Sequence, residues 1–455
     1  MASLDLFIVN VAFDAIGKSF HGVALADLSW VLNAYAIVYA ALLVPLGRLA
    51  DRFSRRGGFI LGLTIFTLGS IACAASTGLW MLVAFRVVQA IGAALLTPTS
   101  LGLVVASVPD HRRVAAVRIW AASGALAAAA GPVAGGLLLT LSWRWVFLVN
   151  VPIGVLALLG ALVFVPRSDH RETGPWPDVP GALLLVVGIG SLSLGMVKGP
   201  DWGWLAGREL LVLAITVAAV TTFVARSLRH HSPVIDPALL KVRSFTSANI
   251  AALAFSVAFA GVLLEIILWM QNVWGYSALR TGLAVSPGPL MVPIFAAVAQ
   301  RLSKTISADK LIAAGCLVCA AGALLVLTSV GPTPNYFVEI FPGWVVGGIG
   351  VGLALPTLLS SATLNLPAAR AATGSAVINM SRQVGSALGV SILIAVLGHP
   401  VGYLAAHTAF VHAWWTWVAI DIAAAALALA TSRRRPTAER SPTPTQQTRV
   451  TTAIS

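Results

Sequence analysis

The sequence predicts an all-α, polytopic membrane protein with fourteen transmembrane helices. Of its 455 residues, 58% are hydrophobic and only 10% are charged, and its mean hydropathy is +0.90. Soluble globular chains contain about 25% charged residues, and a soluble domain of this size could not bury so much apolar surface. The composition therefore excludes an intrinsically disordered chain, a secreted disulfide scaffold and an ordinary cytosolic enzyme.

Fourteen apolar runs follow one another along the chain, most of them near the ~20 residues that a helix needs to cross a bilayer. They cover residues 1–17, 27–47, 57–76, 79–107, 114–139, 144–165, 179–198, 208–227, 245–271, 280–300, 310–330, 337–363, 371–397 and 410–431. The remainder, 432–455, has no periodicity and predicts a disordered tail. The first run is at the lower limit of the spanning length, so we expect a natural start codon about ten residues upstream.

Basic residues alternate between the loops. Most of the 29 Lys and Arg residues fall in one set of loops, at 48–56, 112–113, 167–171, 226–243, 301–310 and 370, and in the tail. Since basic loops stay in the cytoplasm, we expect an even number of helices and both termini inside. The same rule explains the net charge of +13 without a nucleic-acid partner.

The chain contains an internal repeat. Residues 87–109 align without a gap on 345–367, with an offset of 258 and nine of 23 positions identical. Two like-oriented halves are one of the known transporter architectures. We therefore expect six-helix halves at 1–166 and 244–431, joined by a linker, 167–243, that carries two extra helices.

Three acidic residues lie inside apolar runs: Asp5, Glu265 and Asp421. A carboxylate inside a membrane is costly and burial favours its protonated form, so these residues are candidate proton or substrate sites. Arg86 also needs a cavity or a partner. We expect an Asp5–Arg86 pair that serves either proton coupling or structure alone. Glu265 and Asp421 either bind a cationic substrate or have their carboxyl groups stabilised by neighbouring residues.

Small residues form one face of the run 114–139: Gly124, Gly131, Pro132, Gly135 and Gly136. Small residues let transmembrane helices pack backbone to backbone, and proline bends a helix by removing a hydrogen bond. The face predicts a close helix crossing, either purely structural or connected with transport.

The loop Gly47–Arg56 reads GRLADRFSRR. Gly47 allows helices to approach closely, Asp51 can form pairs at helix ends, and Arg52 and Arg55 can bind carbonyls or acidic partners. An acid among arginines is more than the positive-inside rule requires. The counterpart in the second half, AVAQRLSK, keeps basic residues but lacks the acid.

These motifs resemble the major facilitator superfamily, and within it the fourteen-helix drug:proton antiporters of the QacA/EmrB-like branch. GRLADRFSRR is similar to the signature between its second and third helices, with Ser54 in place of Gly. FRVVQAIGAAL is similar to its R-x-x-Q-G-x-G helix, with Ala90 in place of Gly. GPVAGG resembles the antiporter signature of helix five, and LDLFIVNVAFDAIG resembles the first helix, with Phe7 in place of Thr and Asp14 in place of Pro.

The resemblance covers nearly the whole chain. It implies the major facilitator fold, a conformational latch at the loop residues Gly47, Asp51, Arg52 and Arg55, and export rather than import. Because they are charged residues inside the membrane, we expect proton coupling at Asp5 and Arg86, on the first and fourth helices. Glu265 and Asp421, which are not family signatures, are further candidates. Residues expected to line the substrate cavity, or to pack in the core, are Asn10, Trp30, Tyr35, Gln89, Gln271, Asn379 and Arg382.

We therefore expect a monomeric, proton-coupled exporter of hydrophobic, cationic or amphipathic small molecules in a bacterial cytoplasmic membrane. Its partners would be the substrate, protons and the lipid bilayer. No metal or other cofactor is expected, because Cys316 and Cys319 lack a second ligand pair and no phosphate-binding loop occurs. The tryptophans at the predicted interfaces are expected to be interfacial anchors; they are Trp202, Trp204, Trp414, Trp415 and Trp417.

Other functions remain open at this point. A dedicated exporter of a single metabolite or self-made antibiotic fits the sequence equally well, and the helix-five motif disfavours an importer. A non-transporting membrane sensor would leave Asp5 and Arg86 dispensable. A membrane enzyme is disfavoured because the sequence has no plausible cluster of catalytic residues.

Overall fold

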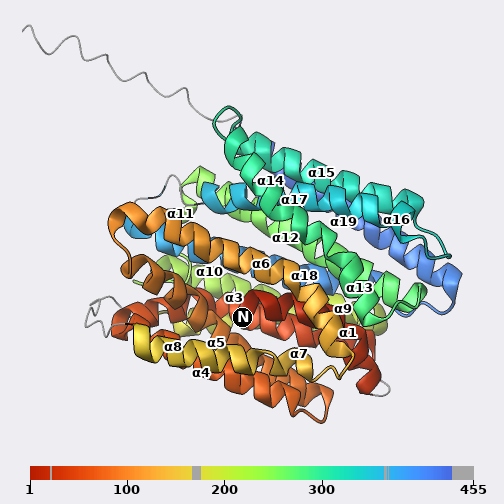
Figure 1. Cartoon of the computed structure of the whole chain (residues 1–455), viewed down its shortest axis with the longest axis horizontal. Coiled ribbons are helices and arrows are strands. Elements are labelled where there is room, and N and C mark those ends of the chain that lie inside the picture. The colour runs from red at the N-terminus through yellow and green to blue at the C-terminus, as the bar shows by residue number, and fades with distance from the viewer. Residues whose placement is uncertain (21–22, 166–175, 363–365, 367, 433–455) are drawn as a thin grey trace, which may run out of the picture.

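The protein is a bundle of long, roughly parallel helices (Figure 1). The computed structural model describes residues 1–20, 23–165, 176–362, 366 and 368–432, and contains no strand within them. The expected tail beyond Ser432 and the linker residues 167–175 lie outside this part. Thirteen helices of the described residues are long and apolar enough to cross a membrane. The all-α, polytopic fold class is thereby confirmed.

The N-terminal half consists of six long helices. They are α1 (Ala2–Ser19), α3 (Trp30–Phe53), α4 (Arg55–Ala74), α5 (Leu79–Ala106), α6 (Arg113–Leu139) and α8 (Asn150–Phe164). The short helices α2 (Leu25–Leu28), η1 (Asp110–Arg112) and α7 (Trp145–Leu148) join them. Although α1 is not among the thirteen apolar spans, it packs along α6 as a full member of the half.

The C-terminal half repeats this plan. Its long elements are α12 (Arg243–Leu268), the pair α13 (Ala278–Val285) and α14 (Pro287–Leu302), α15 (Ala308–Ser329), α17 (Phe341–Ser361), α18 (Ala368–Leu397) and α19 (Tyr403–Ser432). The π-helical turn η2 (Trp269–Val273) extends α12, and the short helix α16 (Tyr336–Glu339) precedes α17. Pro287 explains the break between α13 and α14, because proline lacks an N–H and fits the first turn of a helix.

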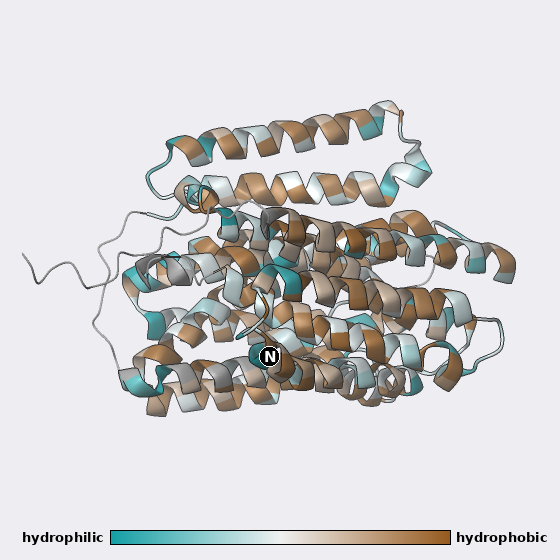
Figure 2. Cartoon of the chain, turned by 90° about the horizontal axis from the view of Figure 1, so that it is seen from above, coloured by the Kyte–Doolittle hydropathy of each residue, from teal (hydrophilic) through white to brown (hydrophobic). Residues whose placement is uncertain are grey.

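Two helices stand between the halves in the sequence. They are α9 (Val179–Trp202) and α10 (Gly207–Arg229), with the short α11 (Pro237–Leu240) after them. α9 packs against α3 of the first half and α18 of the second, and α10 packs on the outer side of α9. Figure 2 shows this pair at the upper edge of the bundle.

Helix ends and close crossings follow from single residues. Ser54 ends α3 and begins α4, because its Oγ accepts a hydrogen bond from the Gly57 N–H at 3.1 Å. Gly92 lets α5 meet α4, since an added Cβ would lie 2.5 Å from Phe66 N. Its repeat partner Gly350 lets α17 meet α15, where an added Cβ would lie 2.6 Å from the carbonyl oxygen of Gly315.

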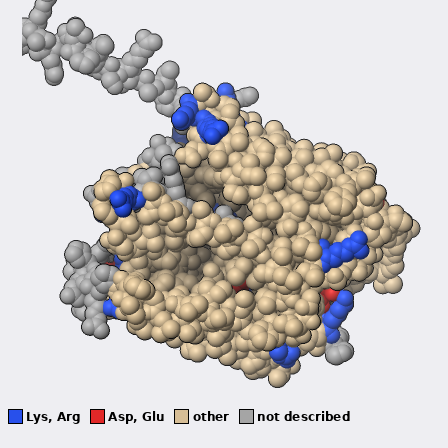
Figure 3. All heavy atoms as spheres, viewed as in Figure 1, with Lys and Arg blue, Asp and Glu red and all other residues tan. Residues whose placement is uncertain are grey.

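The bundle has two polar ends and an apolar middle. Figure 2 shows hydrophobic residues along most of each helix, and in Figure 3 the middle of the visible face is almost free of charged side chains. We call the end with the loops around Arg48, Arg226 and Arg301 the basic end, and the other the opposite end. Figure 3 also shows a hollow between α6 and the C-terminal half, toward the basic end.

Candidate functional site

A buried ion pair lies at the centre of the N-terminal half. Asp5 on α1 and Arg86 on α5 are both fully buried, and Arg86 Nη1 donates to Asp5 Oδ2 at 2.5 Å. A charge buried in a membrane protein needs a partner in this way, because leaving it unpaired costs several kcal/mol or more. The structure thus brings together the two charged residues that the sequence predicted to pair.

Neutral amides complete the coordination of Asp5. Gln89 Nε2 donates to Asp5 Oδ1 at 2.9 Å, and Asn150 Nδ2 donates to the same oxygen at 3.1 Å. Gln89 Nε2 also donates to Ser70 Oγ at 2.8 Å, while Arg86 Nη1 donates to Gln89 Oε1 at 2.6 Å. We call these five residues the Asp5 network.

The network joins helices that are distant in sequence. Asp5 comes from α1, Ser70 from α4, Arg86 and Gln89 from α5, and Asn150 begins α8. Arg86 and Gln89 are three residues apart, which places both side chains on one face of α5. Asn150 and Ser70 were not expected from the sequence, although Asn150 lies in WRWVFLVNVPIG, which also resembles the superfamily.

The guanidinium of Arg86 is held independently of Asp5. Its Nε donates to the carbonyl oxygen of Val31 at 3.0 Å, and its carbon lies 4.1 Å from the centre of the Tyr35 ring. A cation over an aromatic face is attracted by the ring quadrupole. Arg86 is therefore held to α3 by contacts that do not involve Asp5.

The other two buried acids lie elsewhere, within the C-terminal half. Glu265 on α12 accepts a hydrogen bond at 2.5 Å from Trp417 Nε1 of α19, and its other oxygen has no partner among the described residues. The Trp417 ring fits there because Gly261 has no side chain. Asp421 is buried on α19 near Cys316. The structure does not bring either acid into the Asp5 network.

Two of the five tryptophans expected at the membrane interface are core residues. Trp414 and Trp417 are fully buried, Trp202 is partly buried, and Trp204 and Trp415 are exposed. The interfacial prediction was wrong for the two buried residues because Trp417 finds a buried acceptor in Glu265, and Trp414 packs at 5.5 Å from the Trp269 ring.

The glycine-rich face of α6 packs against two other helices. An added Cβ at Gly131 would lie 2.6 Å from Phe7 Cβ of α1, and one at Gly135 would lie 3.3 Å from Ile8 Cα. An added Cβ at Gly136 would lie 2.7 Å from Leu279 Cα of α13, in the other half. This face thus joins the helix that carries Asp5 to the C-terminal half. Gly124 makes only a loose approach, with Ser3 Oγ at 3.8 Å.

The two halves touch at the opposite end. Gln271 Nε2 of η2 donates to the carbonyl oxygen of Val11 on α1 at 3.1 Å. Asn33 Nδ2 of α3 donates to Ser391 Oγ of α18 at 3.0 Å. Since Val11 follows Asp5 on the same helix, α1 connects the Asp5 network directly to this closed interface.

The residues expected to line a substrate cavity separate into groups. Tyr35 and Gln89 are fully buried beside Arg86 rather than on a cavity wall, and Gln271 belongs to the closed interface. Asn10 Nδ2 donates to the carbonyl oxygen of Leu6 on the same helix at 2.7 Å. Trp30 is partly buried at the start of α3. Asn379 and Arg382 lie together on α18, with Arg382 Nη1 donating to Asn379 Oδ1 at 3.2 Å.

Comparison with known proteins identifies the family. Residues 1–390 match the Major Facilitator Superfamily. This chain belongs to the major facilitator superfamily. It is a membrane transporter, since the superfamily consists of transporters and not enzymes, and the resemblance seen in the sequence is confirmed.

Curated relatives in the superfamily are resistance and export proteins. The chain is 32% identical over 399 residues to the methylenomycin A resistance protein of Streptomyces coelicolor, covering 87% of this chain and 83% of that protein. It is 30% identical to the tetracenomycin C resistance and export protein of Streptomyces glaucescens, covering 88% and 74%. It is 33% identical to the multidrug resistance protein Stp of Mycobacterium tuberculosis, covering 87% and 73%.

Solved transporter structures share the fold. A peptide transporter POT in complex with sulfate matches with a TM-score of 0.69 and 18% identity, covering 95% of this chain and 92% of that chain. A bacterial homologue of the human lysosomal transporter Spinster, in an inward-facing and unoccupied conformation, matches with a TM-score of 0.68 and 16% identity, covering 97% and 96%. At these identities the similarity shows the fold alone.

The superfamily loop between α3 and α4 contacts the inserted segment. Arg55 Nε pairs with Asp51 Oδ1 at 2.5 Å, across the break at Ser54 between the two helices. Arg48 Nη1 donates to the Pro233 carbonyl oxygen at 2.6 Å, and Arg52 lies 4.6 Å from the centre of the Trp176 ring. Gly47 allows α5 to approach closely, since an added Cβ at this position would lie 3.2 Å from Pro98 Cβ.

Proposed function

We propose that this superfamily member is a proton-coupled efflux transporter that works by alternating access. The observation that carries the proposal is the Asp5 network, a fully buried carboxylate whose cation is also held by α3. Intramembrane ionisable residues mark proton relays and ion pathways in transporters. Export is supported by the relatives, which are named as resistance and export proteins.

The mechanism starts in the outward-open state, where one proton from the outside binds Asp5. The neutral acid no longer attracts Arg86, which stays on α3 through Val31 and Tyr35. α1 is then free to shift relative to α5. Because α1 bonds Gln271 and packs on α6, its movement closes the interface at the opposite end and opens the basic end. Loss of the proton to the cytoplasm restores the ion pair, and a substrate taken up from the inside is then carried back to the outward-open state.

In this mechanism the basic end faces the cytoplasm and the described conformation opens inward. The hollow toward the basic end and the contacts Gln271–Val11 and Asn33–Ser391 at the opposite end support this orientation. We place the transporter in the bacterial cytoplasmic membrane with both termini inside. One chain contains both halves, so we propose that a monomer suffices.

The residues between the halves favour an amphipathic substrate. Phe255 and Phe259 stack at 6.1 Å, and Phe7 meets Phe259 edge-on across the two halves at 6.4 Å. Arg382 lies near Tyr39, its Nε is buried without an acceptor, and none of the described carboxylates pairs with it. We therefore extend the expected cationic substrates to compounds with a carboxylate or phenolate group.

Breadth of substrate is a second question, on which the relatives differ. Two of them are named for single antibiotics and one for multidrug resistance. The single-antibiotic names favour a dedicated exporter, which would use the same proton-coupled mechanism. Comparing many compounds in one transport assay separates the two functions, because a dedicated exporter responds to one chemical scaffold only.

Everted membrane vesicles test the proposal. A pH-sensitive dye reports an imposed gradient, acidic inside, while a lipophilic cation (ethidium) or an aromatic acid (naphthoate) is added in turn. We expect proton release on addition of a substrate by the wild type and none by Asp5→Asn. Asp14→Asn is the matched control, because Asp14 lies on the same helix and pairs with exposed Lys18. Equal proton release by wild type and Asp5→Asn would refute coupling through Asp5.

A further inference from the structure

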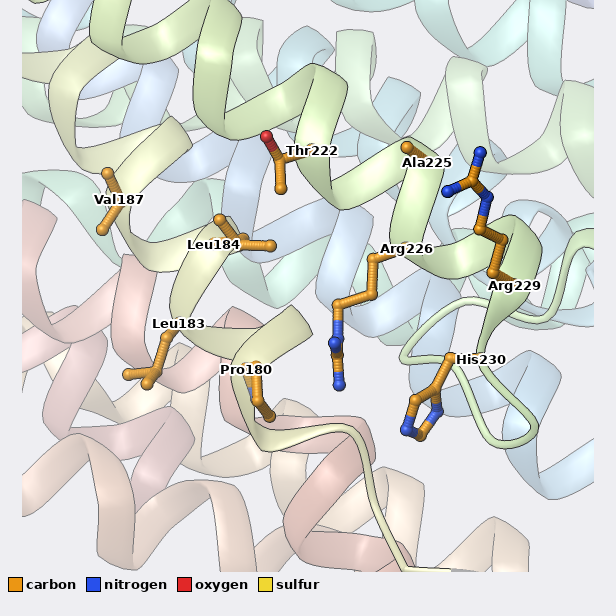
Figure 4. Close-up of a pocket in the computed structure, with 9 residues that line it drawn as sticks. All are labelled: Pro180, Leu183, Leu184, Val187, Thr222, Ala225, Arg226, Arg229 and His230. Atoms are coloured by element: carbon orange, nitrogen blue, oxygen red, sulfur yellow. The ribbon is translucent and has the colours of Figure 1, made fainter.

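A groove lies between the two inserted helices at the basic end. Its volume is about 650 Å³, and Figure 4 shows that it opens between the first turns of α9 and the last turns of α10. Leu183, Leu184 and Val187 of α9 form its apolar wall. Leu183 and Val187 are 58% and 47% exposed, so this wall faces outward from the bundle.

The mouth of the groove is basic. Arg226, Arg229 and His230 line it where α10 ends. In Figure 4, Arg226 and His230 point into the same opening beside Pro180, and Arg229 extends on the other side of the helix end. A groove that is apolar along its length and basic at its mouth has the chemical pattern of a lipid chain and an anionic headgroup.

Neighbouring residues fix the donors at this mouth. Asp178 Oδ1 accepts from Arg226 Nε at 2.6 Å, which leaves the terminal nitrogens of the guanidinium for another acceptor. His230 Nδ1 accepts the Ser232 N–H at 3.1 Å, so the neutral ring carries its hydrogen on Nε2 and can donate there. Arg48 holds this turn in place through its bonds to Ser232 and Pro233.

We propose that this groove binds an anionic phospholipid of the membrane leaflet at the basic end, with the phosphate at Arg226 and His230 and an acyl chain along α9. The groove runs from Pro180 to Val187, about 10 Å along the helix axis, from the polar end into the apolar layer. Asp178 and Asp236 lie near these arginines and offset two positive charges, and the three arginines Arg226, Arg229 and Arg48 leave the mouth cationic. This site goes beyond the proposed export function and does not depend on it.

The position of the groove gives the lipid a structural role. α10 packs only on α9 among the major helix contacts, whereas α9 packs on both halves. A phospholipid whose headgroup bonds α10 and whose chain covers α9 would therefore hold the inserted pair together at the bundle edge. No residue of the Asp5 network takes part.

Native mass spectrometry of the purified full-length chain tests the site. The protein in detergent is incubated with phosphatidylglycerol or with phosphatidylcholine of the same acyl chains, and bound lipid is counted. We expect the wild type to retain phosphatidylglycerol preferentially. Replacing both Arg226→Gln and His230→Gln should lower that retention about fivefold, for the loss of one arginine near an anionic lipid, and leave phosphatidylcholine unchanged.

The controls separate this site from general charge effects. Arg208→Gln removes the same charge at the other end of α10 and should retain phosphatidylglycerol like the wild type. Leu183→Trp, which fills the apolar wall, should lower retention with the charge unchanged. Size-exclusion chromatography confirms that each variant is folded, and His230→Gln alone replaces the double variant if the latter aggregates. Equal retention of both lipids by the wild type, unchanged preference in the double variant, or release of the lipid by inorganic phosphate alone would overturn the proposal.

Discussion

The two halves use equivalent positions for different purposes. With the repeat offset of 258, Arg86 of α5 aligns in sequence with Trp344 of α17. Arg86 Nε donates to the Val31 carbonyl oxygen of α3 at 3.0 Å, and Trp344 Nε1 donates to the Val285 carbonyl oxygen of α13 at 2.7 Å. Both side chains therefore tie equivalent helices together, but only the N-terminal half carries a charge there.

The difference extends to the acids. Asp5 has a cation and two amide donors, whereas Glu265 has the indole of Trp417 on one oxygen and no described partner on the other. In the proposed mechanism, protonation of Asp5 would break an ion pair between helices, whereas protonation of Glu265 would leave its hydrogen bond in place. The proposal therefore assigns the switch to the N-terminal half and the scaffold against which it moves to the C-terminal half.

The largest effect is expected from removing the cation. Arg86→Met leaves Asp5 buried without its partner, so we expect destabilisation of about 3–5 kcal/mol and loss of transport. Trp344→Phe removes one neutral hydrogen bond and should cost about 1 kcal/mol. Thermal unfolding of the two purified variants measures both effects, and an equal loss in the two would contradict the asymmetry.

A smaller effect is expected at Asn150. Asn150→Ala removes one donor from the Asp5 carboxylate but leaves Arg86 and Gln89 in place. We expect a loss of about 1–2 kcal/mol in stability and slower proton-coupled transport, because a buried acceptor loses part of its coordination. The conservative Asn150→Gln is the companion variant. Unchanged stability and transport in Asn150→Ala would exclude this residue from the network's function.

In the C-terminal half the matching change should be mild. Glu265→Gln keeps an oxygen that accepts from Trp417 Nε1, so stability should fall by less than about 1 kcal/mol. Proton release on substrate addition should persist in vesicles. Its loss in Glu265→Gln, with retention in Asp5→Asn, would transfer the switch to the C-terminal half.

The smallest effect is expected in the loop between α3 and α4. The Asp51–Arg55 pair is partly exposed, and such surface ion pairs contribute about 0.2–1 kcal/mol, so loss of this pair in Arg55→Gln should lower stability by about that amount. Arg301 lies in the counterpart of this loop in the second half, which lacks the acid, so Arg301→Gln should leave stability unchanged. A transport defect in Arg55→Gln without a stability change would support the expected role of the loop between α3 and α4 as a conformational latch.

Much of the fold could be predicted from hydropathy alone. Each apolar run corresponds to a helix or to consecutive helical segments, because every segment that crosses the apolar layer must satisfy its own backbone hydrogen bonds. The run 280–300 was expected as one helix and is divided at Ser286 and Pro287. The run 337–363 is similarly divided into α16 and α17, with Pro342 in the first turn of α17.

The site was predictable only where charge demanded a partner. Asp5 and Arg86 had to be paired because each alone is too costly in a membrane. Asn150 and Ser70 are uncharged, so nothing in the sequence required them to lie beside Asp5. The Glu265–Trp417 bond was missed for a related reason, since a tryptophan near a helix end resembles an interfacial anchor whether or not it reaches a buried acceptor.

Infrared difference spectroscopy of the purified transporter tests the central claim most directly. Acidification should produce the carbonyl band of a protonated carboxylic acid in the wild type. The account predicts that this band disappears in Asp5→Asn and remains in Glu265→Gln and Asp421→Asn. A band that survives in Asp5→Asn and disappears in Glu265→Gln would contradict it, because the titrating acid would then lie in the C-terminal half.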